Sequence, residues 1–533
     1  MIIKILIIAI LSYMGSIGAP FFFGTTGGFY TLGRPLIAAA LVGIILGDVQ
    51  TALAIGVVLQ AMYIGVITPG GVMPFDVDYV GYLTTALIIL AKANTSLAPA
   101  LAIPVGLVGV LLWNITYVSN VAFIRYADKK VEEGSTKGVR TANLLPQIWC
   151  FIVRVVPAVV ILYFGSEFLQ NFVNNLPPQV NQMLGVISGL LPALGIGILL
   201  NMIIKEKVYL GIYLIGFILV VYLKLPIIAV TLMGIVIALF YYKFVSSKSE
   251  ESFDPMEKET QAEKGIKMPE SILKKVWFNW FMFNGPSQSG ERMQGIAFGH
   301  SMTPVIEKLY GNNKEERVKA LRRHTTLFNV EPQIGAIIPG IVTAMEEQRA
   351  NGAEIEEDTI NTVKVALMGP LSGIGDTLVP GTLIPILLAI AIGITNSAGL
   401  AGPLFYAVVY IGGTILYSWY LFKLGYKSGL SGLQKIMAEG SISALTTALN
   451  IVGLLVMGAL TANYIHVTTP LQYVSGKMVV SIQGILDGIF PGMLSLGAVA
   501  LVYLLLSKKK LSATKIILIL FAIAIVGVLI GIL

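Results

Sequence analysis

Carboxylates stand beside glycines and prolines inside two apolar stretches of this 533-residue sequence. Asp376 lies in "MGPLSGIGDTLVPGTLIPILLAIAIGI" (368–394), and Asp76 and Asp78 follow the break in "YIGVITPGGVMPFDVDYVGYLTTALIIL" (63–90). Ionisable groups at membrane depth typically have a function, and broken apolar segments at corresponding positions of two halves indicate a transport site near the bilayer midplane. The alternative is that each break is a loop between short helices and each acid only caps a helix. The pattern alone leaves both interpretations open.

The composition is typical of an integral membrane protein. Hydrophobic residues make up 56% of the chain and charged residues 12%, and the mean hydropathy is +0.81. Several runs reach or approach the roughly 20 apolar residues that a membrane helix needs. The clearest are 97–124, 208–223, 227–242, 400–420, 441–462, 488–506 and 516–533. We therefore expect an all-α polytopic membrane protein with two helical units, in which glycine and proline break some helices or form re-entrant hairpins.

The sequence gives no sign of cofactor or metal chemistry. With a single cysteine, Cys150, it can form no internal disulfide and no cysteine-based zinc site, and its three histidines show no metal-ligand spacing. It contains no G-x-x-x-x-G-K-[ST] phosphate-binding loop and no recognisable pairing of a nucleophile with a base. We expect no cofactor, no metal and no catalytic residue. Energy for transport must then come from an ion gradient or from another protein.

Charge density divides the chain into an apolar arm, a polar centre and a second apolar arm. Residues 246–271 have mixed charge and few large apolar residues, which predicts a flexible linker. We expect membrane units at 1–245 and 272–533. In the second unit, the aromatic and charged stretch 272–364 predicts amphipathic helices at the membrane interface, and 365–533 predicts membrane helices.

The formal charge of +7 indicates topology rather than nucleic-acid binding, because the cations cluster at the ends of apolar runs. Basic clusters at 125–140, in the linker and at 508–510 should be cytoplasmic, which would leave the C-terminus outside. Residues 1–19 could be a secretory signal, but a retained first membrane helix fits better because the chain stays apolar afterwards.

The first arm resembles a known transporter subunit. The segment "GRPLIAAALVGIILGDVQTALAIGVVLQAMYIG" (33–65) is similar to the IIC subunit of the mannose/fructose/sorbose family of phosphoenolpyruvate-dependent sugar phosphotransferase systems. The shared pattern is Arg-Pro-Leu, then Gly-Asp, then Leu-Glu or Leu-Gln before an apolar run.

The second arm resembles the IID subunit of the same family. The matching segments are "ERMQGIAFGHSMTPVIEKLY" (291–310), "RRHTTLFNVEPQIGAIIPGI" (322–341), "EEQRANGAEI" (346–355) and "VALMGPLSGIGDTL" (365–378). IIC and IID are usually separate chains, whereas here they look fused through the linker.

The resemblance implies a group translocator in the bacterial plasma membrane. Such a protein binds an external hexose or amino-hexose and delivers it to a separate phospho-IIB protein, which is charged by IIA and carries the phosphohistidine. The family resemblance further implies inverted repeats, an elevator-like movement and a homotrimer. Which sugar is carried cannot be read from the sequence.

The resemblance also suggests substrate-binding residues, because sugar hydroxyls need side chains that donate and accept hydrogen bonds. In the first arm these are Gln60 and Asp76; Gln60 has the alternative of bonding a neighbouring helix.

In the second arm the candidates are Glu291, Gln294, Asn329 and Asp376. Glu291 could instead pair with Arg292, and for Asp376 we favour a backbone role at the start of a half-helix over sugar contact. We place His324 on a helix surface.

Two other functions remain open from the sequence alone. One is an ion-coupled secondary sugar transporter with Asp76 and Asp376 as coupling acids. The other is a membrane receptor or scaffold without transport.

Overall fold

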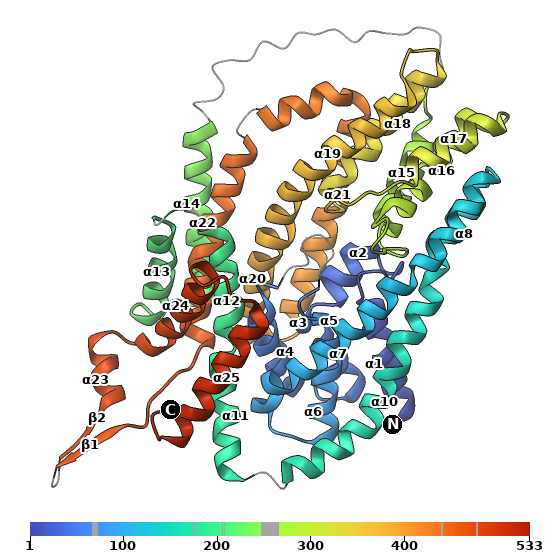
Figure 1. The fold of residues 1–533 in the computed structure, drawn as a ribbon. Coiled ribbons are helices and arrows are strands. Elements are labelled where there is room, and N and C mark those ends of the chain that lie inside the picture. The colour runs from blue at the N-terminus through green and yellow to red at the C-terminus, as the bar shows by residue number, and fades with distance from the viewer. Residues whose placement is uncertain are drawn as a thin grey trace.

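The computed structural model describes residues 1–66, 73–174, 177–204, 206, 208–246, 266–438, 441–475 and 478–533. Within them nearly all regular structure is helical, and the β structure is one hairpin of β1 (Gln472–Ser475) and β2 (Met478–Ser481). Figure 1 shows the helices packed into one bundle, with both chain termini toward its lower end and the C-terminal end of α14 toward its upper end. The expected all-α architecture is confirmed.

The first half of the chain contains the elements up to α14. They are α1 (Ile2–Met14), α2 (Gly24–Gly27), η1 (Gly28–Leu32), α3 (Pro35–Leu46), α4 (Val49–Tyr63), α5 (Val77–Tyr79), η3 (Val80–Thr84), α6 (Thr85–Ala91), η4 (Thr95–Leu97), α7 (Ala98–Ser119), α8 (Val121–Glu132), α9 (Thr136–Leu144), α10 (Pro146–Asn174), α11 (Pro178–Leu190), α12 (Pro192–Ile203), α13 (Val208–Val221) and α14 (Ile227–Ser246).

The second half begins with α15. Its elements are α15 (Glu270–Phe283), α16 (Gly295–Tyr310), α17 (Lys314–His324), η6 (Ile334–Ala336), α18 (Ile337–Ala350), α19 (Glu357–Leu378), η7 (Val379–Leu383), α20 (Ile384–Ala398), α21 (Ala401–Ala438), α22 (Ser441–Tyr464), the hairpin, α23 (Ile482–Ile489), α24 (Met493–Ser507) and α25 (Ala513–Leu529). Of the predicted linker 246–271, the part at 247–265 lies outside the described residues.

Seven helical stretches in the described residues are long and apolar enough to cross a membrane, or up to nine if each of two bent pairs is one span. The seven are Thr95–Glu132, Thr136–Asn171, Gln182–Ile203, Ile227–Val245, Glu357–Ala398, Ala401–Lys427 and Thr446–Tyr464. The bent pairs are Gly24–Leu32 with Pro35–Leu46 and Ile482–Ile489 with Met493–Ser507. The chain is therefore a multi-pass membrane protein.

Wide helical turns follow the acids of both halves. The glycine/proline break predicted before Asp76 falls on residues 67–72, outside the described residues, and α19 runs through Pro370 without a break to Leu378. A π-helical turn, η3, begins two residues after Asp78, and another, η7, begins three residues after Asp376. Wide helical turns of this kind are frequent at functional sites. In the first half the backbone also bends by 75° between Leu32 and Pro35, because Pro35 starts a new helix after Gly33 and Arg34.

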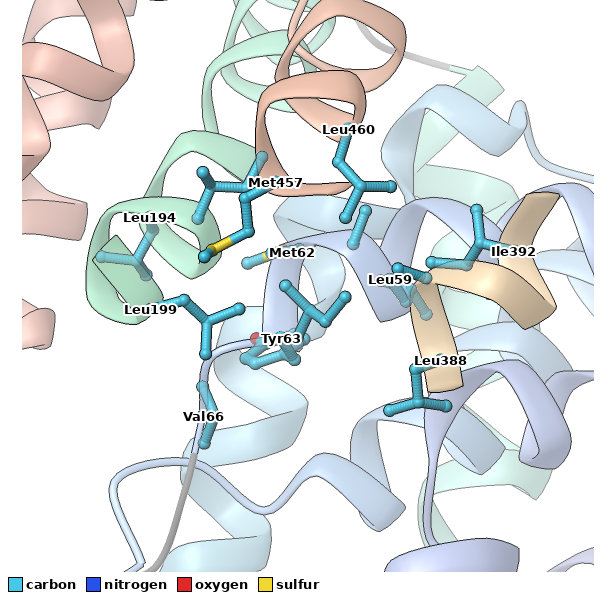
Figure 2. Close-up of a cluster of buried hydrophobic side chains, with 14 of the residues drawn as sticks. Leu59, Met62, Tyr63, Val66, Leu194, Leu199, Leu388, Ile392, Met457 and Leu460 are labelled. Atoms are coloured by element: carbon cyan, nitrogen blue, oxygen red, sulfur yellow. The ribbon is translucent and has the colours of Figure 1, made fainter. Parts of the chain in front are cut away.

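The apolar core joins the two halves of the chain. Figure 2 shows buried side chains from first-half helices α4 and α12 against others from second-half helices α20 and α22. The residues are Leu59, Met62 and Tyr63 of α4, Leu194 and Leu199 of α12, Leu388 and Ile392 of α20, and Met457 and Leu460 of α22. Since this surface is buried between the halves, each half completes the packing of the other.

Candidate functional site

A polar cavity lies between the two halves of the chain. The first half contributes three lining residues, and the second half contributes the turn after α15, the segment before η6 and one face of α19. The volume of the cavity is about 40 Å³. Its lining residues are Ile17, Thr25, Tyr30, Asn284, Gln288, Gln294, Asn329, Val330, Glu331, Pro332, Ser372 and Asp376.

Two second-half segments of the cavity wall are joined through Gln294. Its side-chain Oε1 accepts a hydrogen bond from Val330 N (2.9 Å) and its Nε2 donates to Val330 O (3.0 Å). Its backbone N donates to Phe328 O at 2.7 Å. The Gln294 side chain therefore bonds both the N–H and the C=O of Val330, as the backbone of a paired β-strand would. These bonds hold the segment at Val330 in place and leave one N–H of the Gln294 amide for a ligand.

A side-chain pair joins the halves at the cavity. Thr25 Oγ1 of the first half donates to Asn284 Oδ1 of the second at 2.6 Å. The Nδ2 of Asn284 donates to the backbone oxygens of Trp280 and Phe281, each at 3.0 Å. Asn284 therefore has both amide protons engaged and serves the cavity chiefly as framework.

Three lining groups make no side-chain hydrogen bond within the described part of the chain. They are the amides of Gln288 and Asn329 and the hydroxyl of Tyr30. Gln288 and Tyr30 are nevertheless 4% and 5% exposed, so these two residues face the cavity rather than bulk water, whereas Asn329 is partly exposed. Buried polar groups usually have partners. A ligand with several hydroxyl groups would supply both donors and acceptors to them.

Two carboxyl groups complete the polar lining. Glu331 is 2% exposed and accepts hydrogen bonds from the backbone nitrogens of Gln333 (3.2 Å) and Ile334 (2.8 Å). Burial raises the pKa of Glu331 to about 8, so this carboxyl holds a proton at lower pH. Asp376 is half-buried, and its Oδ2 accepts from Ser372 Oγ at 3.4 Å.

The cavity brings together three of the residues singled out in the sequence: Gln294, Asn329 and Asp376. Asp376 lies inside α19, two residues before the helix ends, and α19 begins after Glu356; the carboxylate therefore does not cap the start of that helix.

Glu291 lies on the outer side of the same turn. It is exposed and lines a separate groove of about 510 Å³. Glu291 and Arg292 form no ion pair in the described part of the chain; instead Arg292 Nη1 pairs with Asp128 Oδ1 of the first half at 2.7 Å.

Gln60 is completely buried within the first half, where its Oε1 accepts from Leu36 N at 3.4 Å. Its Nε2 has no hydrogen-bond partner among the described residues. Gln60 is not among the residues that line the cavity. Its substrate contact stays a prediction.

Asp76 is also buried away from the cavity lining. Its Oδ2 accepts from Arg154 Nη1 at 2.7 Å, and Asp78 Oδ1 accepts from Arg154 Nη2 at 2.6 Å. Asp76 Oδ1 accepts from Tyr79 N at 3.2 Å and so caps α5. Sugar contact by Asp76 therefore also stays a prediction.

Several lining residues were not predicted from the sequence, among them Gln288, Glu331 and the three of the first half. A usable signal exists for Glu331, an acid directly before proline in the segment "NVEPQ". No local pattern marks Gln288, because its position in the cavity depends on contacts with the first half.

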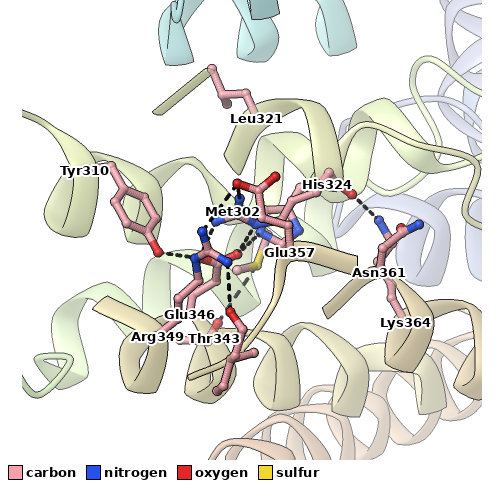
Figure 3. Close-up of polar contacts among 12 residues, drawn as sticks. Met302, Tyr310, Leu321, His324, Thr343, Glu346, Arg349, Glu357, Asn361 and Lys364 are labelled. Carbon is pink, nitrogen blue, oxygen red and sulfur yellow. Dashed lines mark hydrogen bonds and ion pairs between the residues drawn. The ribbon is translucent and has the colours of Figure 1, made fainter. Parts of the chain in front are cut away.

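The helices beside the cavity are held by a buried charged network, shown in Figure 3. Glu346 of α18 accepts hydrogen bonds from Arg323 Nε (2.6 Å), His324 Nε2 (2.8 Å) and Tyr310 hydroxyl (2.7 Å). Lys364 of α19 donates to Arg323 O at 2.6 Å. The network ties α16, α17, α18 and α19 together, and α19 carries Asp376 to the cavity.

The placement of His324 on a helix surface was wrong, because the ring is fully buried against Phe298 and Glu346. Burial lowers the pKa of His324 to about 4, so the ring is neutral at pH 7 and its Nε2–H donates to the carboxylate. The hydrogen bonds from Arg323 and His324 hold the pKa of Glu346 well below its usual range, although burial alone would raise it.

Comparison with known proteins accounts for both halves. Residues 2–240 match the family model of the sorbose-specific IIC component of phosphotransferase systems, and residues 267–533 match that of the mannose/fructose/sorbose family IID component. The chain belongs to the mannose/fructose/sorbose family of phosphotransferase systems. It is a membrane sugar-translocating component in which IIC and IID parts occur in one polypeptide, as the sequence predicts.

Individual relatives match one part each. The mannose-specific EIID component of Escherichia coli K12 is 38% identical over 280 residues, covering 51% of this chain and 98% of that protein. The sorbose-specific EIID component of Lacticaseibacillus casei is 38% identical over 275 residues, covering 50% and 96%. The mannose-specific EIIC component of E. coli K12 is 29% identical over 242 residues, covering 45% and 87%. A solved structure of the mannose transporter ManYZ with microcin E492 is 38% identical, covers 51% of this chain and 99% of that chain, and has a TM-score of 0.30.

Proposed function

We propose that the cavity between the IIC and IID parts is the sugar-binding site of this permease. The observation that supports it is the pair of side-chain amides, Gln288 and Asn329, that line the cavity without side-chain partners among the described residues. Each amide supplies two donors and an acceptor, which suits vicinal hydroxyl groups of a hexose. Asp376 adds a carboxyl group whose hydrogen bonds are stronger when it is ionised, and Glu331 adds one that is mostly protonated at pH 7 and can donate as well as accept.

The volume of the cavity indicates that binding involves movement. Space of about 40 Å³ holds a few water molecules but not a hexose ring. We propose that the IIC and IID lining residues move apart to admit sugar. An elevator-like displacement of one part of the bundle against the rest would open the cavity to either side of the membrane.

Phosphorylation is assigned to partner proteins. We propose that a cytoplasmic phospho-IIB protein, charged by IIA, transfers its phosphoryl group to a hydroxyl of the delivered hexose or amino-hexose. The family membership supports this assignment, because permeases of this class work with such partners. We further propose a homotrimer, with the linker cytoplasmic and the C-terminus outside. In support of the orientation, the C-terminal ends of α8 and α14 share the upper end of the bundle in Figure 1, and Lys129, Lys130 and Lys243 lie near those ends.

The test measures sugar binding and phosphorylation separately. Purified full-length protein is titrated with radiolabelled mannose, fructose and sorbose, and membranes containing it are supplied with phosphoenolpyruvate, the general phosphotransfer proteins, IIA and IIB. We expect sugar phosphate only when IIA and IIB are both present. Gln288→Ala and Asn329→Ala should each weaken sugar binding about threefold to tenfold, the loss expected for one or two neutral hydrogen bonds.

Gln348→Ala, which removes an exposed amide from α18, is the matched control and should bind sugar like wild type. Wild-type affinity in both cavity variants would contradict the site. Uptake that needs a proton gradient and no IIA or IIB would contradict the phosphotransferase mechanism.

A further inference from the structure

The turn that carries Gln288 into the cavity belongs to the IID part, but it is held by side-chain amides of the IIC part. We propose that Asn120, Asn143 and Gln147 are positioning residues for sugar binding, acting through the backbone of residues 283–288. The proposal rests on the proposed sugar site and adds to it the group of IIC residues that fixes its geometry.

Gln147 of α10 holds the middle of the turn. Its Nε2 donates to Pro286 O at 2.7 Å, and its Oε1 accepts from the hydroxyl of Tyr13 at 3.0 Å. Tyr13 thus fixes which way the amide faces, because only the amide oxygen can accept that proton. The Gln147 side chain is 6% exposed, so water offers little competition for the carbonyl of Pro286.

Asn143 of α9 holds the turn at two points. Its Nδ2 donates to Phe283 O at 2.9 Å, and its Oδ1 accepts from Ser287 Oγ at 2.6 Å. The same Nδ2 lies 3.0 Å from His300 Nδ1, which accepts its second proton when that nitrogen is unprotonated. Asn143 is fully buried, and its side chain alone pairs the Phe283 carbonyl, the Ser287 hydroxyl and the His300 ring nitrogen.

Asn120, between α7 and α8, holds the backbone of the cavity-lining residue Gln288. Its Nδ2 donates to Gln288 O at 2.9 Å, and the side chain is 2% exposed. The backbone of Gln288 is therefore fixed by the IIC part, while its side-chain amide stays free to face the cavity. Asn120 itself is not a cavity-lining residue, so its effect on sugar must pass through Gln288.

The close approach of the two backbones supports a fixed register. A Cβ on Gly285 would lie 2.5 Å from Ile17 O of the IIC part, a distance that Cβ atoms essentially never show. Any side chain at this position would move the turn away from the IIC part. The turn therefore fits the IIC surface only with glycine at 285 and with its carbonyls aligned on the three amides.

Preorganisation is the physical reason to expect an effect on sugar. A binding amide held in its bound orientation loses little conformational entropy when the ligand arrives. Without the Asn120 donor, Gln288 O is left buried without a partner, and the turn gains freedom to move. Sugar then has to order Gln288 on binding, and its affinity falls.

The experiment is a double-mutant cycle on the full-length protein in detergent. Asn120→Leu removes the donor with little change in volume, and Gln288→Ala removes the side chain it positions. Dissociation constants for radiolabelled mannose, fructose and sorbose are measured for wild type, both single variants and the double variant, together with melting temperatures without sugar. Asn463→Leu is the control for loss of an amide hydrogen bond away from the cavity, because the Nδ2 of the exposed Asn463 also donates to a backbone oxygen, that of Ala459 within α22.

We expect Asn120→Leu to weaken binding of the transported sugar about threefold to tenfold. Combined with Gln288→Ala it should weaken binding no further than Gln288→Ala alone, because Asn120 acts only through that side chain. Asn463→Leu should keep wild-type affinity even if it lowers the melting temperature equally.

Two results would overturn the proposal and are distinguishable. If Gln288→Ala reduces affinity but Asn120→Leu does not, or if their effects multiply fully, the amide does not act through Gln288 and only the positioning role fails. If Gln288→Ala leaves the affinity for all three sugars unchanged, the sugar site itself is misplaced.

Discussion

Asp76 and Arg154 form a buried pair in which the guanidinium donates two hydrogen bonds to one carboxylate, Nη1 to Oδ2 at 2.7 Å and Nη2 to Oδ1 at 3.2 Å. Both side chains are 1% exposed. The pair ties the segment before α5 to the membrane helix α10. Such a contact suits a structural role for Asp76, because both carboxylate oxygens are already engaged, whereas Asp376 has one long hydrogen bond and faces the cavity.

The first prediction is that Asp76→Asn lowers stability more than sugar affinity. The substitution keeps the shape but leaves much of the Arg154 charge uncompensated in a buried site, a loss on the order of 3 to 5 kcal/mol when a partner is removed outright. Asp78 still accepts from Arg154, so the loss should be smaller than that. The measurement is the melting temperature of the full chain without sugar, with the exposed Asp358→Asn as control.

The second prediction is the reverse pattern for Asp376→Asn. An ionised carboxylate gives hydrogen bonds worth roughly 1.5 to 3 kcal/mol, so its loss should weaken sugar binding about tenfold to a hundredfold. The melting temperature without sugar should stay near that of wild type, because among the described residues Asp376 takes part in a single side-chain hydrogen bond, from Ser372. A large drop in melting temperature with normal sugar affinity would contradict sugar contact by Asp376 and support the backbone role that the sequence favours.

The third prediction concerns the fusion of the two parts. Residues 1–246 and 266–533, produced together as separate chains, should copurify and bind sugar, because hydrogen bonds across the parts do not depend on the linker. Examples are Thr25 to Asn284 (2.6 Å), Gln333 to Thr26 (3.0 Å) and Tyr406 to the backbone of Tyr30 (2.6 Å).

The same pair of fragments with Gly285→Val is the control. A branched side chain there meets Ile17 O, so copurification should fail. Stable wild-type fragments that do not associate would show that the linker itself holds the parts together.

The sequence predicts the architecture better than the site. Hydropathy indicates the helical class, because that signal is local. The glycine/proline stretch before Asp376, in contrast, is helical in the structure. Two spans, Thr136–Asn171 and Gln182–Ile203, were not recognised among the apolar runs; the first includes polar residues of α9 and Arg154, which tertiary contacts satisfy.

The roles of the acids could not be predicted because their partners are distant in sequence. Asp76 and Arg154 are separated by 78 positions, and nothing near either residue indicates the pair. Gln288 and Asn120, 168 positions apart, are a similar case. Conversely, Gln294 and Asn329 could be predicted to lie at a site because they fall on family motifs, and both line the cavity. The side chain of Gln294 is bonded to the backbone of Val330, and substrate contact by either residue stays a prediction.

The last prediction is a loss of stability in mild acid caused by His324. Burial lowers its pKa from the ordinary 6.5 to about 4, so the unfolded chain takes up a proton at a pH where the folded chain does not. The stability due to the neutral ring is therefore fully present above pH 6.5 and is lost as pH falls toward 4, at about 1.4 kcal/mol for each unit within that window. His324→Gln retains a donor for Glu346 without titrating, so its melting temperature should fall less than that of wild type between pH 7 and 5. His300, whose pKa burial lowers to about 3, contributes in the same direction, so part of the pH dependence of wild type remains in the variant.

The control is His466→Gln, which replaces an exposed histidine and should follow wild type. Identical slopes for wild type and His324→Gln would show that the buried ring is not a source of the acid sensitivity.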